Sequence, residues 1–404
     1  MEAELKPESG ANGGRRRAAL QFVVLLGVVS LLADVTYEGA RSLTGPYLAL
    51  LGASATTVGV VSGLGEFIGY ALRLVSGWLA DRTRRYWPIT IAGYALNLLA
   101  VPLLALAGKW EIAVFLLILE RLGKAVRVPA RDVILSHATS QLGRGWGFGL
   151  HEALDQIGAV TGPTLMAGVL FYRQGDYRTG FAILLVPALL ALGVLVAARL
   201  RYPSPAELES KRPGLEATGY TRTYWIYLAA VALVAAGFAD FPLIAFHFKQ
   251  HKIVADDMIP LFYAVAMAVD AVAALVFGRL FDKFGLGVLA VVALLSSAFA
   301  PLVFFGGFGL ALAGMALWGV GMGAQESIMR AAVAEMIPAE RRGAAYGLFN
   351  FGYGTAWFLG SALLGVLYDI SLPALVAFSV LMQLAAIPLF LMVRRPSGPP
   401  ARKE

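Results

Sequence analysis

The sequence contains no cysteine and few charged residues. Because cysteine is absent from all 404 positions, the chain has no disulfide, no thiolate metal site and no cysteine nucleophile. Charged residues make up 15% of the chain, whereas soluble domains carry about 25%. With 58% hydrophobic residues and a mean hydropathy of +0.71, the chain has too little polar surface for a water-soluble particle. The composition therefore predicts an integral membrane protein.

Twelve apolar segments are long enough to cross a bilayer, which needs about 20 residues per helix. They lie at residues 18–50, 56–80, 87–106, 112–137, 146–171, 179–198, 224–248, 256–281, 286–305, 307–334, 343–368 and 371–393. We therefore expect an all-α integral membrane fold with twelve transmembrane helices. The polar residues 1–17 are followed by no small-residue cleavage site, so we expect an uncleaved first helix rather than a signal peptide.

Basic residues are distributed unequally between the two sides of the predicted membrane. If the N-terminus is cytoplasmic, the cytoplasmic segments hold about 21 lysines and arginines and the external loops about five. This distribution predicts a multi-pass protein of the cell membrane, plasma or inner, with both termini in the cytoplasm. The net charge of +7 then reflects membrane topology, and we expect no nucleic-acid partner.

The two halves of the chain repeat each other. The segment Gly77–Arg82 reappears as Gly278–Lys283, and Arg144-Gly145 reappears as Arg342-Gly343. We therefore expect two pseudo-symmetric six-helix bundles at residues 18–198 and 224–393. A cytoplasmic linker at 199–223 would join them, and cytoplasmic tails would occupy 1–17 and 394–404.

Every third segment, namely the third, sixth, ninth and twelfth, contains no Asp, Glu, Lys or Arg. A charge in hydrocarbon is costly, so the charge-free helices can face lipid while the charged helices line an interior. This pattern predicts a polar cavity between the two bundles.

The loop after the second segment resembles motif A of the major facilitator superfamily. The match runs from Gly77 to Arg85, with Arg84 in place of the usual glycine, and the second copy at Gly278–Gly285 keeps that glycine. The resemblance covers nearly the whole chain in helix number, linker position and motif placement. It implies a monomeric secondary transporter that works by alternating access.

The same resemblance implies a conformational role for the motif A residues. They are Gly77, Asp81 and Arg82 in the first copy and Gly278, Asp282 and Lys283 in the second. Asp81 would hold the cytoplasmic side closed through a helix N-terminus and Arg131 of the fourth helix. The alternative is that these charges only fix the membrane topology.

Ionisable residues follow one face of the fourth segment. Glu120, Lys124, Arg127 and Arg131 are spaced i, i+4, i+7 and i+11, which places them within an arc of roughly 60°. Each would cost about 2.5–3.5 kcal/mol if it faced lipid, so they must face water, each other or a ligand. We predict that Lys124 and Arg127 contact substrate or take part in coupling. The alternative is a static lattice of salt bridges.

Asp34 is the first candidate for a proton carrier. It lies near mid-membrane, and a carboxylate that has lost part of its water holds a proton more tightly. The alternative is a structural pairing of Asp34 with the cations of the fourth segment. Glu38 and Glu120 are the next candidates.

Further ionisable residues are expected to line a substrate cavity. They are Arg41, Glu66, Arg73, Lys124, Arg127, His151, Asp155, Asp240, Asp270 and Glu326. Glu326 occupies nearly the repeat-equivalent place of Arg127, so the two are predicted to face the cavity and could pair across it. Internal charge neutralisation and helix packing are the alternatives for several of the others.

The sequence also lacks the motifs of an energy-consuming enzyme. It has no phosphate-binding loop with a lysine, and His151-Glu152 lacks the second histidine of a zinc-protease helix. We therefore expect no metal, no cofactor and no enzymatic activity. Gly158, Gly162 and Pro163 resemble an element of exporters, which favours proton-coupled efflux of a small organic compound by antiport. The alternatives are sodium as the coupling ion, a solute or metal-ion symporter or uniporter, and a membrane enzyme or receptor.

Overall fold

The described chain is almost entirely helical. The computed structural model describes residues 9–139, 144–203, 221–337 and 342–393, and within some helices single side chains, including those of Asp81 and Glu326, lie outside the description. No strand occurs in these ranges. The predicted all-α class is confirmed.

The first half of the chain comprises α1 to α7. The bounds are α1 Ser9–Leu50, α2 Ala55–Thr83, α3 Tyr86–Leu103 with the short 3₁₀ turn η1 Leu104–Leu106, α4 Trp110–Thr139, α5 Arg144–Tyr172, α6 Tyr177–Ile183 and α7 Leu185–Arg201. The second half comprises α8 Arg222–Gly237, α9 Phe241–Gln250, α10 Ile259–Phe284, α11 Gly287–Ser297, α12 Phe299–Phe305, α13 Phe308–Met336, α14 Arg342–Ile370 and α15 Leu372–Met392. The predicted linker and tails fall largely on 204–220, 1–8 and 394–404, outside the described residues, so the exact domain boundaries stay a prediction.

Ten segments of the described chain are long and apolar enough to cross a membrane. Three of them join two consecutive helices: α6 with α7, α8 with α9, and α11 with α12. The remaining two predicted spans correspond to α4 and α5, which carry ionisable residues along their length. The fold therefore agrees with twelve transmembrane helices.

The ends of the helices differ in charge. Helix ends at one end of the molecule carry Arg82, Arg84, Arg85, Arg199, Arg201, Arg222 and Lys283. At the opposite end, Asp176 begins α6 and its carboxylate accepts the backbone N–H of Arg178 at 3.1 Å. A hydrogen bond from the Thr179 hydroxyl lowers the pKa of Asp176.

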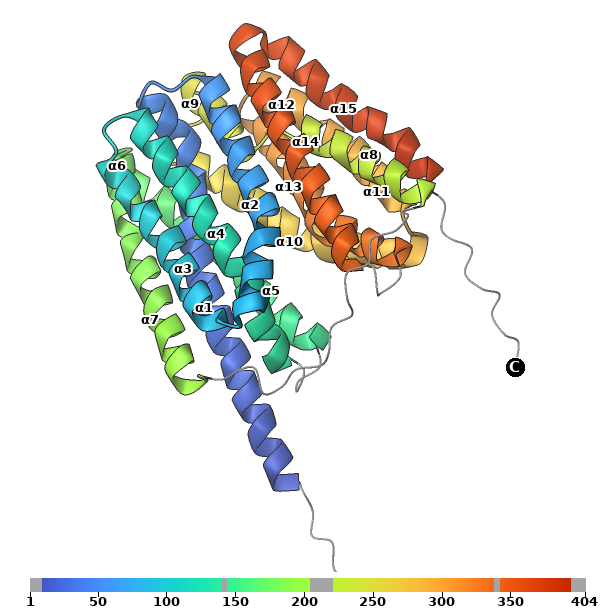
Figure 1. The fold of residues 1–404 in the computed structure, drawn as a ribbon. Helices are drawn as coiled ribbons and strands as arrows, with labels where there is room; N and C mark the ends of the chain where they lie inside the picture. The colour runs from blue at the N-terminus through green and yellow to red at the C-terminus, as the bar shows by residue number, and fades with distance from the viewer. Residues whose placement is uncertain (1–8, 140–143, 204–220, 338–341, 394–404) are drawn as a thin grey trace, which may run out of the picture.

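Helices α7 and α15, which belong to two of the charge-free spans, lie at the outside of the molecule. Figure 1 shows α7 and α15 on opposite flanks. Large apolar side chains on these helices remain exposed, among them Leu189 and Leu190 of α7 and Leu381 and Leu391 of α15. Because a bilayer solvates such surfaces, this exposure fits helices that face lipid.

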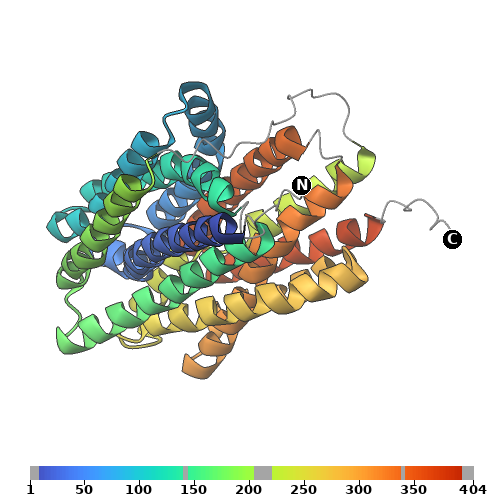
Figure 2. The ribbon, with the colours of Figure 1, turned by 90° about the horizontal axis from the view of Figure 1, so that it is seen from below.

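The two halves contact each other through glycines. From below, Figure 2 shows the blue-to-green helices of the first half beside the yellow-to-red helices of the second. A Cβ added at Gly45 of α1 would lie 2.0 Å from the Pro242 carbonyl oxygen of α9, and one at Gly59 of α2 would lie 2.3 Å from the Ser361 carbonyl oxygen of α14. Small residues therefore allow these backbones to approach closely across the two halves.

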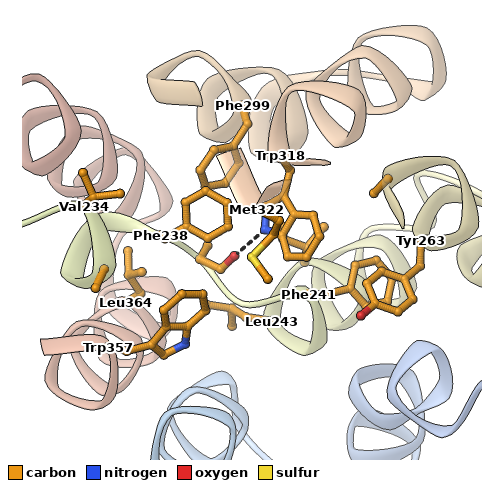
Figure 3. Close-up of a cluster of buried hydrophobic side chains, with 14 of the residues drawn as sticks. Val234, Phe238, Phe241, Leu243, Tyr263, Phe299, Trp318, Met322, Trp357 and Leu364 are labelled. Atoms are coloured by element: carbon orange, nitrogen blue, oxygen red, sulfur yellow. Dashed lines mark hydrogen bonds between the residues drawn. The ribbon is translucent and has the colours of Figure 1, made fainter. Parts of the chain in front are cut away.

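The seventh span is interrupted between α8 and α9. Residues 238–240 are not helical, and Asp240 accepts the Phe241 N–H at 2.9 Å as the cap of α9. The Trp318 indole donates to the Ala239 carbonyl at 2.9 Å within a cluster of aromatic rings that includes Phe238 (Figure 3). These bonds satisfy the interrupted backbone inside the protein, as a break at membrane depth requires.

Candidate functional site

A cavity of about 540 Å³ lies between the two halves. Residues of α1, α2, α4 and α5 line one side, and residues of α10, α13 and α14 line the other. The volume lies in the range of about 300–1,000 Å³ that is typical of small-molecule sites. It is therefore the candidate solute site.

The two walls of the cavity differ in chemistry. The first-half wall holds the charged residues Asp34, Glu38, Arg41, Glu66, Arg73, Arg121, Lys124, Arg127, Arg131, Asp132, Glu152 and Asp155. The second-half wall is formed by Ala274, Leu275, Met322, Gln325, Ser327, Phe349, Tyr353 and Trp357, and none of these described residues is ionisable. Charges and rings thus face each other across the cavity.

Arg41 connects three helices. Its Nη2 atom lies 2.6 Å from Asp240 Oδ1 at the start of α9 and 3.4 Å from Glu66 Oε1 of α2. Glu66 Oε1 also lies 3.0 Å from Nη1 of Arg121. A second bond joins the halves nearby, because the Tyr263 hydroxyl of α10 donates to Glu38 Oε2 at 2.6 Å. These contacts neutralise buried charges and connect α1 to the second half.

Tyr37 of α1 is surrounded by cations. Its hydroxyl accepts a hydrogen bond from Arg121 and a longer one, 3.4 Å, from Arg41. The ammonium nitrogen of Lys124 lies 3.6 Å from the centre of the Tyr37 ring. Among the described residues, no carboxylate lies within ion-pair distance of the Lys124 ammonium, so this cation–π contact stands in place of a salt bridge.

The charged residues of α4 divide between the cavity and α3. Glu120 is 3% exposed, accepts from the Asn97 side chain at 2.6 Å and does not line the large cavity. Arg127 is 1% exposed, and its guanidinium lies 4.2 Å from the centre of the Tyr94 ring. Arg131 pairs with Asp132 at 2.9 Å. A helical wheel places these residues on one face, but their long side chains turn toward different neighbours.

Asp34 lines the cavity without a hydrogen bond or ion pair among the described residues. The charges that act on it are those of Asp155, Lys124, Glu38 and Arg127. Asp34 and Lys124 are therefore two opposite charges on one wall, neither of which has a fixed ionic partner there.

Several predicted cavity residues lie elsewhere. His151 is 4% exposed, Asp240 1% and Asp270 0%, and none of the three lines the cavity. Asp240 is instead held at the start of α9 by the cap and by Arg41. Helical spacing predicted the helix face but not the depth of these side chains. Glu326, and so its predicted orientation and pairing with Arg127, lies outside the described side chains.

In the first motif A loop, Arg84 adopts the positive φ angle that is typical of the glycine it replaces. Arg84 ends α2 with φ 54°, in the left-handed region, and Gly285 has φ 67° at the corresponding end of α10. Arg82 is exposed and lies 5.1 Å from the Trp78 ring. Asp81 lies outside the described side chains, so its predicted contact with Arg131 stays a prediction.

The rest of motif A adds no contact to the cavity. Gly77 lies near the end of α2 and faces Pro129 of α4. A Cβ added at Gly77 would lie 3.5 Å from the Cβ of Pro129. In the second copy, the half-buried Gly278 precedes Asp282 and Lys283, which are both exposed. The predicted conformational role of these residues is therefore separate from the cavity.

The sequence reasoning missed the uncharged residues of the site. Tyr37, Tyr353 and Trp357 line the cavity but carry no charge that would attract attention in an apolar segment. One signal was present, because Phe349, Tyr353 and Trp357 follow i, i+4, i+8 spacing and so share a helix face.

Comparisons with known proteins agree with this architecture. The family model for the Major Facilitator Superfamily matches residues 26–252 and again residues 230–404. An uncharacterised protein of Mycobacterium tuberculosis is 44% identical over 408 residues, which cover 97% of this chain and 100% of that protein. An uncharacterised MFS-type transporter of Methanocaldococcus jannaschii is 26% identical over 374 residues, which cover 89% of this chain and 92% of that protein.

The fold is also similar to that of a solved transporter. A crystal structure of the nucleoside transporter NupG, in a mutant form, has a TM-score of 0.78, with 11% identity and coverage of 91% of this chain and 100% of that one. At this identity the likeness concerns the fold alone. The extent of the family match, together with the close relative, shows that the chain belongs to the Major Facilitator Superfamily of transporters.

Proposed function

We propose that this protein moves a small organic solute by alternating access and couples the movement to protons. Family membership supports secondary transport of a small solute. The cavity between the halves supports a solute site there, and the bonds from Arg41 to Asp240 and from Tyr263 to Glu38 support closure of one side of that site.

The observation that carries proton coupling is the pair Asp34 and Lys124. Both line the cavity, and neither has an ionic bond among the described residues. An ionised Asp34 competes with a bound solute for the charge of Lys124, whereas a protonated Asp34 leaves that charge available. Protonation therefore changes the contacts that a solute can make, and such a difference can bias a two-state equilibrium.

The same pair favours movement of proton and solute in one direction. A solute that binds the ammonium group of Lys124 removes the cation that stabilises an ionised Asp34, which favours protonation of Asp34. The proton and the solute would therefore be bound at the same time. Antiport with export is the second candidate, and Gly158, Gly162 and Pro163 favour it by resemblance. In the structure, however, an added Cβ at Gly158 would lie 2.4 Å from the Leu31 carbonyl oxygen, so close packing of α5 on α1 also accounts for a glycine there.

Proteoliposomes that contain a pH-sensitive dye test this proposal. Small organic solutes are added one at a time, and solute uptake and internal pH are both recorded. Acidification of the lumen together with uptake supports symport, and alkalinisation together with uptake supports antiport. Solute uptake with no proton movement under either pH gradient would refute proton coupling.

A further inference from the structure

The second-half wall of the cavity presents a ladder of aromatic rings. Phe349, Tyr353 and Trp357 lie one turn apart on α14, with ring centres 5.8 Å and 5.5 Å apart. Tyr70 of α2 meets Tyr353 edge to face at 5.3 Å. Aromatic surfaces of this kind bind planar rings by offset or edge-to-face stacking.

The Trp357 indole holds a hydrogen-bond donor with no acceptor. The residue is 2% exposed, and its Nε1 atom has no acceptor among the described residues. The Tyr353 hydroxyl, by contrast, donates to Gln325 Oε1 at 2.9 Å. Figure 3 shows Trp357 at the side of the aromatic cluster that faces the blue helices of the first half. A buried donor without an acceptor is unfavourable, and a ligand with an acceptor atom would relieve the cost.

On the opposite wall, Lys124 and Arg127 form no ion pair with a carboxylate of the described residues. Arg127 Nε and Nη1 have no acceptor among the described residues, and Lys124 contacts the Tyr37 ring rather than a carboxylate. Arg41, Arg121 and Arg131 each have a carboxylate within 3.4 Å. Asp34 lies beside Lys124 and Arg127 with no ion-pair partner among the described residues, and its protonation removes one of the negative charges that act on them. A buried cation of this kind is stabilised by an anionic ligand.

We infer that the substrate is an organic anion that carries an aromatic ring. Its carboxylate or phosphate group binds Lys124 and Arg127, and its ring stacks on Tyr353 and Trp357 while an acceptor atom takes the Trp357 N–H. All four residues line the same cavity. This inference rests on the proposed function, because it assigns the solute class of the same site.

Four probes test the inference on the purified full-length protein in detergent. They are 2-naphthoate, 2-naphthyl phosphate, (2-naphthyl)methylammonium and cyclohexanecarboxylate, with affinity measured by calorimetry at one pH and without a gradient. At least one naphthyl anion should bind about tenfold tighter than both the amine and the non-aromatic acid, since charge-assisted hydrogen bonds and stacking each contribute. Which anion binds better distinguishes a carboxylate from a phosphate ligand.

The opposite results would overturn it. If the amine or the non-aromatic acid binds as tightly as the naphthyl anions, or if neither naphthyl anion binds, the assignment is wrong. Because binding is measured without a gradient, a failure of proton coupling would leave this result unchanged, so the two proposals fail independently.

Variants locate the binding groups. Arg127→Gln should weaken the better naphthyl anion about tenfold or more, and Arg127→Lys should restore part of the loss. Trp357→Phe keeps an aromatic ring but removes the N–H and one of the two fused rings, so it should weaken binding less than Arg127→Gln does. Trp225→Phe, at an exposed tryptophan of α8, is the matched control. If Arg127→Gln is not monodisperse, Lys124→Gln replaces it. Parental affinity in a monodisperse variant at either cation would overturn the assignment.

Discussion

The bond between Arg41 and Asp240 should set how readily one side of the cavity opens. It joins α1 to α9 at 2.6 Å, and its two side chains are 9% and 1% exposed. Asp240→Asn removes the charge but keeps a residue that caps helices well, so α9 should still begin at the same place. The change therefore tests the ion pair apart from the cap.

The size of the effect follows from the partners that remain. Removal of one member of a buried ion pair costs about 3–5 kcal/mol when the other charge is left alone. Here Arg41 retains Glu66 at 3.4 Å, which Arg121 also shares. We therefore expect about half of that cost, about 2 kcal/mol, and a shift of about 30-fold toward the state in which this side is open.

A cysteine at Thr44 can report this opening. Thr44 is 7% exposed and lines a small pocket beside Arg41. Because the chain has no native cysteine, the alkylation rate of Thr44→Cys by a bulky maleimide reports the open population. The rate should rise by about the 30-fold shift in Asp240→Asn, while an exposed Lys109→Cys control should react equally in both backgrounds. Equal rates at Thr44→Cys would refute the reasoning.

Three further changes have defined expected outcomes. Asp34→Asn mimics the protonated acid and should abolish solute-coupled proton flux in proteoliposomes while solute binding remains; retained coupling would assign the proton to another group. Trp318→Phe removes the donor to the Ala239 carbonyl at 2.9 Å and should lower stability by about 1–3 kcal/mol in thermal unfolding, so an unchanged Tm would contradict that role. Gly45→Ala places a Cβ 2.0 Å from the Pro242 carbonyl oxygen and should cost about 1–3 kcal/mol. Gly45→Ala should also raise the alkylation rate of Thr44→Cys. If stability and alkylation rate both match those of the parent, α1 and α9 separate without cost.

The sequence was sufficient for the fold because membrane insertion leaves a strong pattern. Segment length and hydropathy predicted twelve spans, and the charge-free segments predicted outer helices such as α7 and α15, whose leucines are exposed. These features depend only on local composition and on the lipid environment. The breaks within spans, such as the one at Asp240, were not predicted, because they depend on tertiary partners such as Trp318.

The site could be predicted only in part. The residues that were expected at the cavity and do line it are Arg41, Glu66, Arg73, Lys124, Arg127 and Asp155. The proton-carrier candidates Asp34 and Glu38 line it as well. Glu120, by contrast, is buried against Asn97 of α3, which lies 23 residues earlier in the chain. Spacing along a helix fixes the direction of a Cβ atom, but a long side chain can turn toward a neighbouring helix. The pairing of charges therefore required the structure.

The difference between the two walls gives a physical route from binding to opening. Glu38 lies one helical turn from Asp34 on α1, and it accepts the Tyr263 hydroxyl that connects α1 to α10. A proton on Asp34 removes a negative charge that acts on both Glu38 and Lys124, which alters the field at a bond between the halves. The uncharged second-half wall contributes no competing ionic bond among its described residues. Among the described residues, the halves can therefore separate along this wall without breaking ion pairs. Separation at Glu38 and Arg41 breaks their bonds to Tyr263 and Asp240, next to the group proposed to carry the proton.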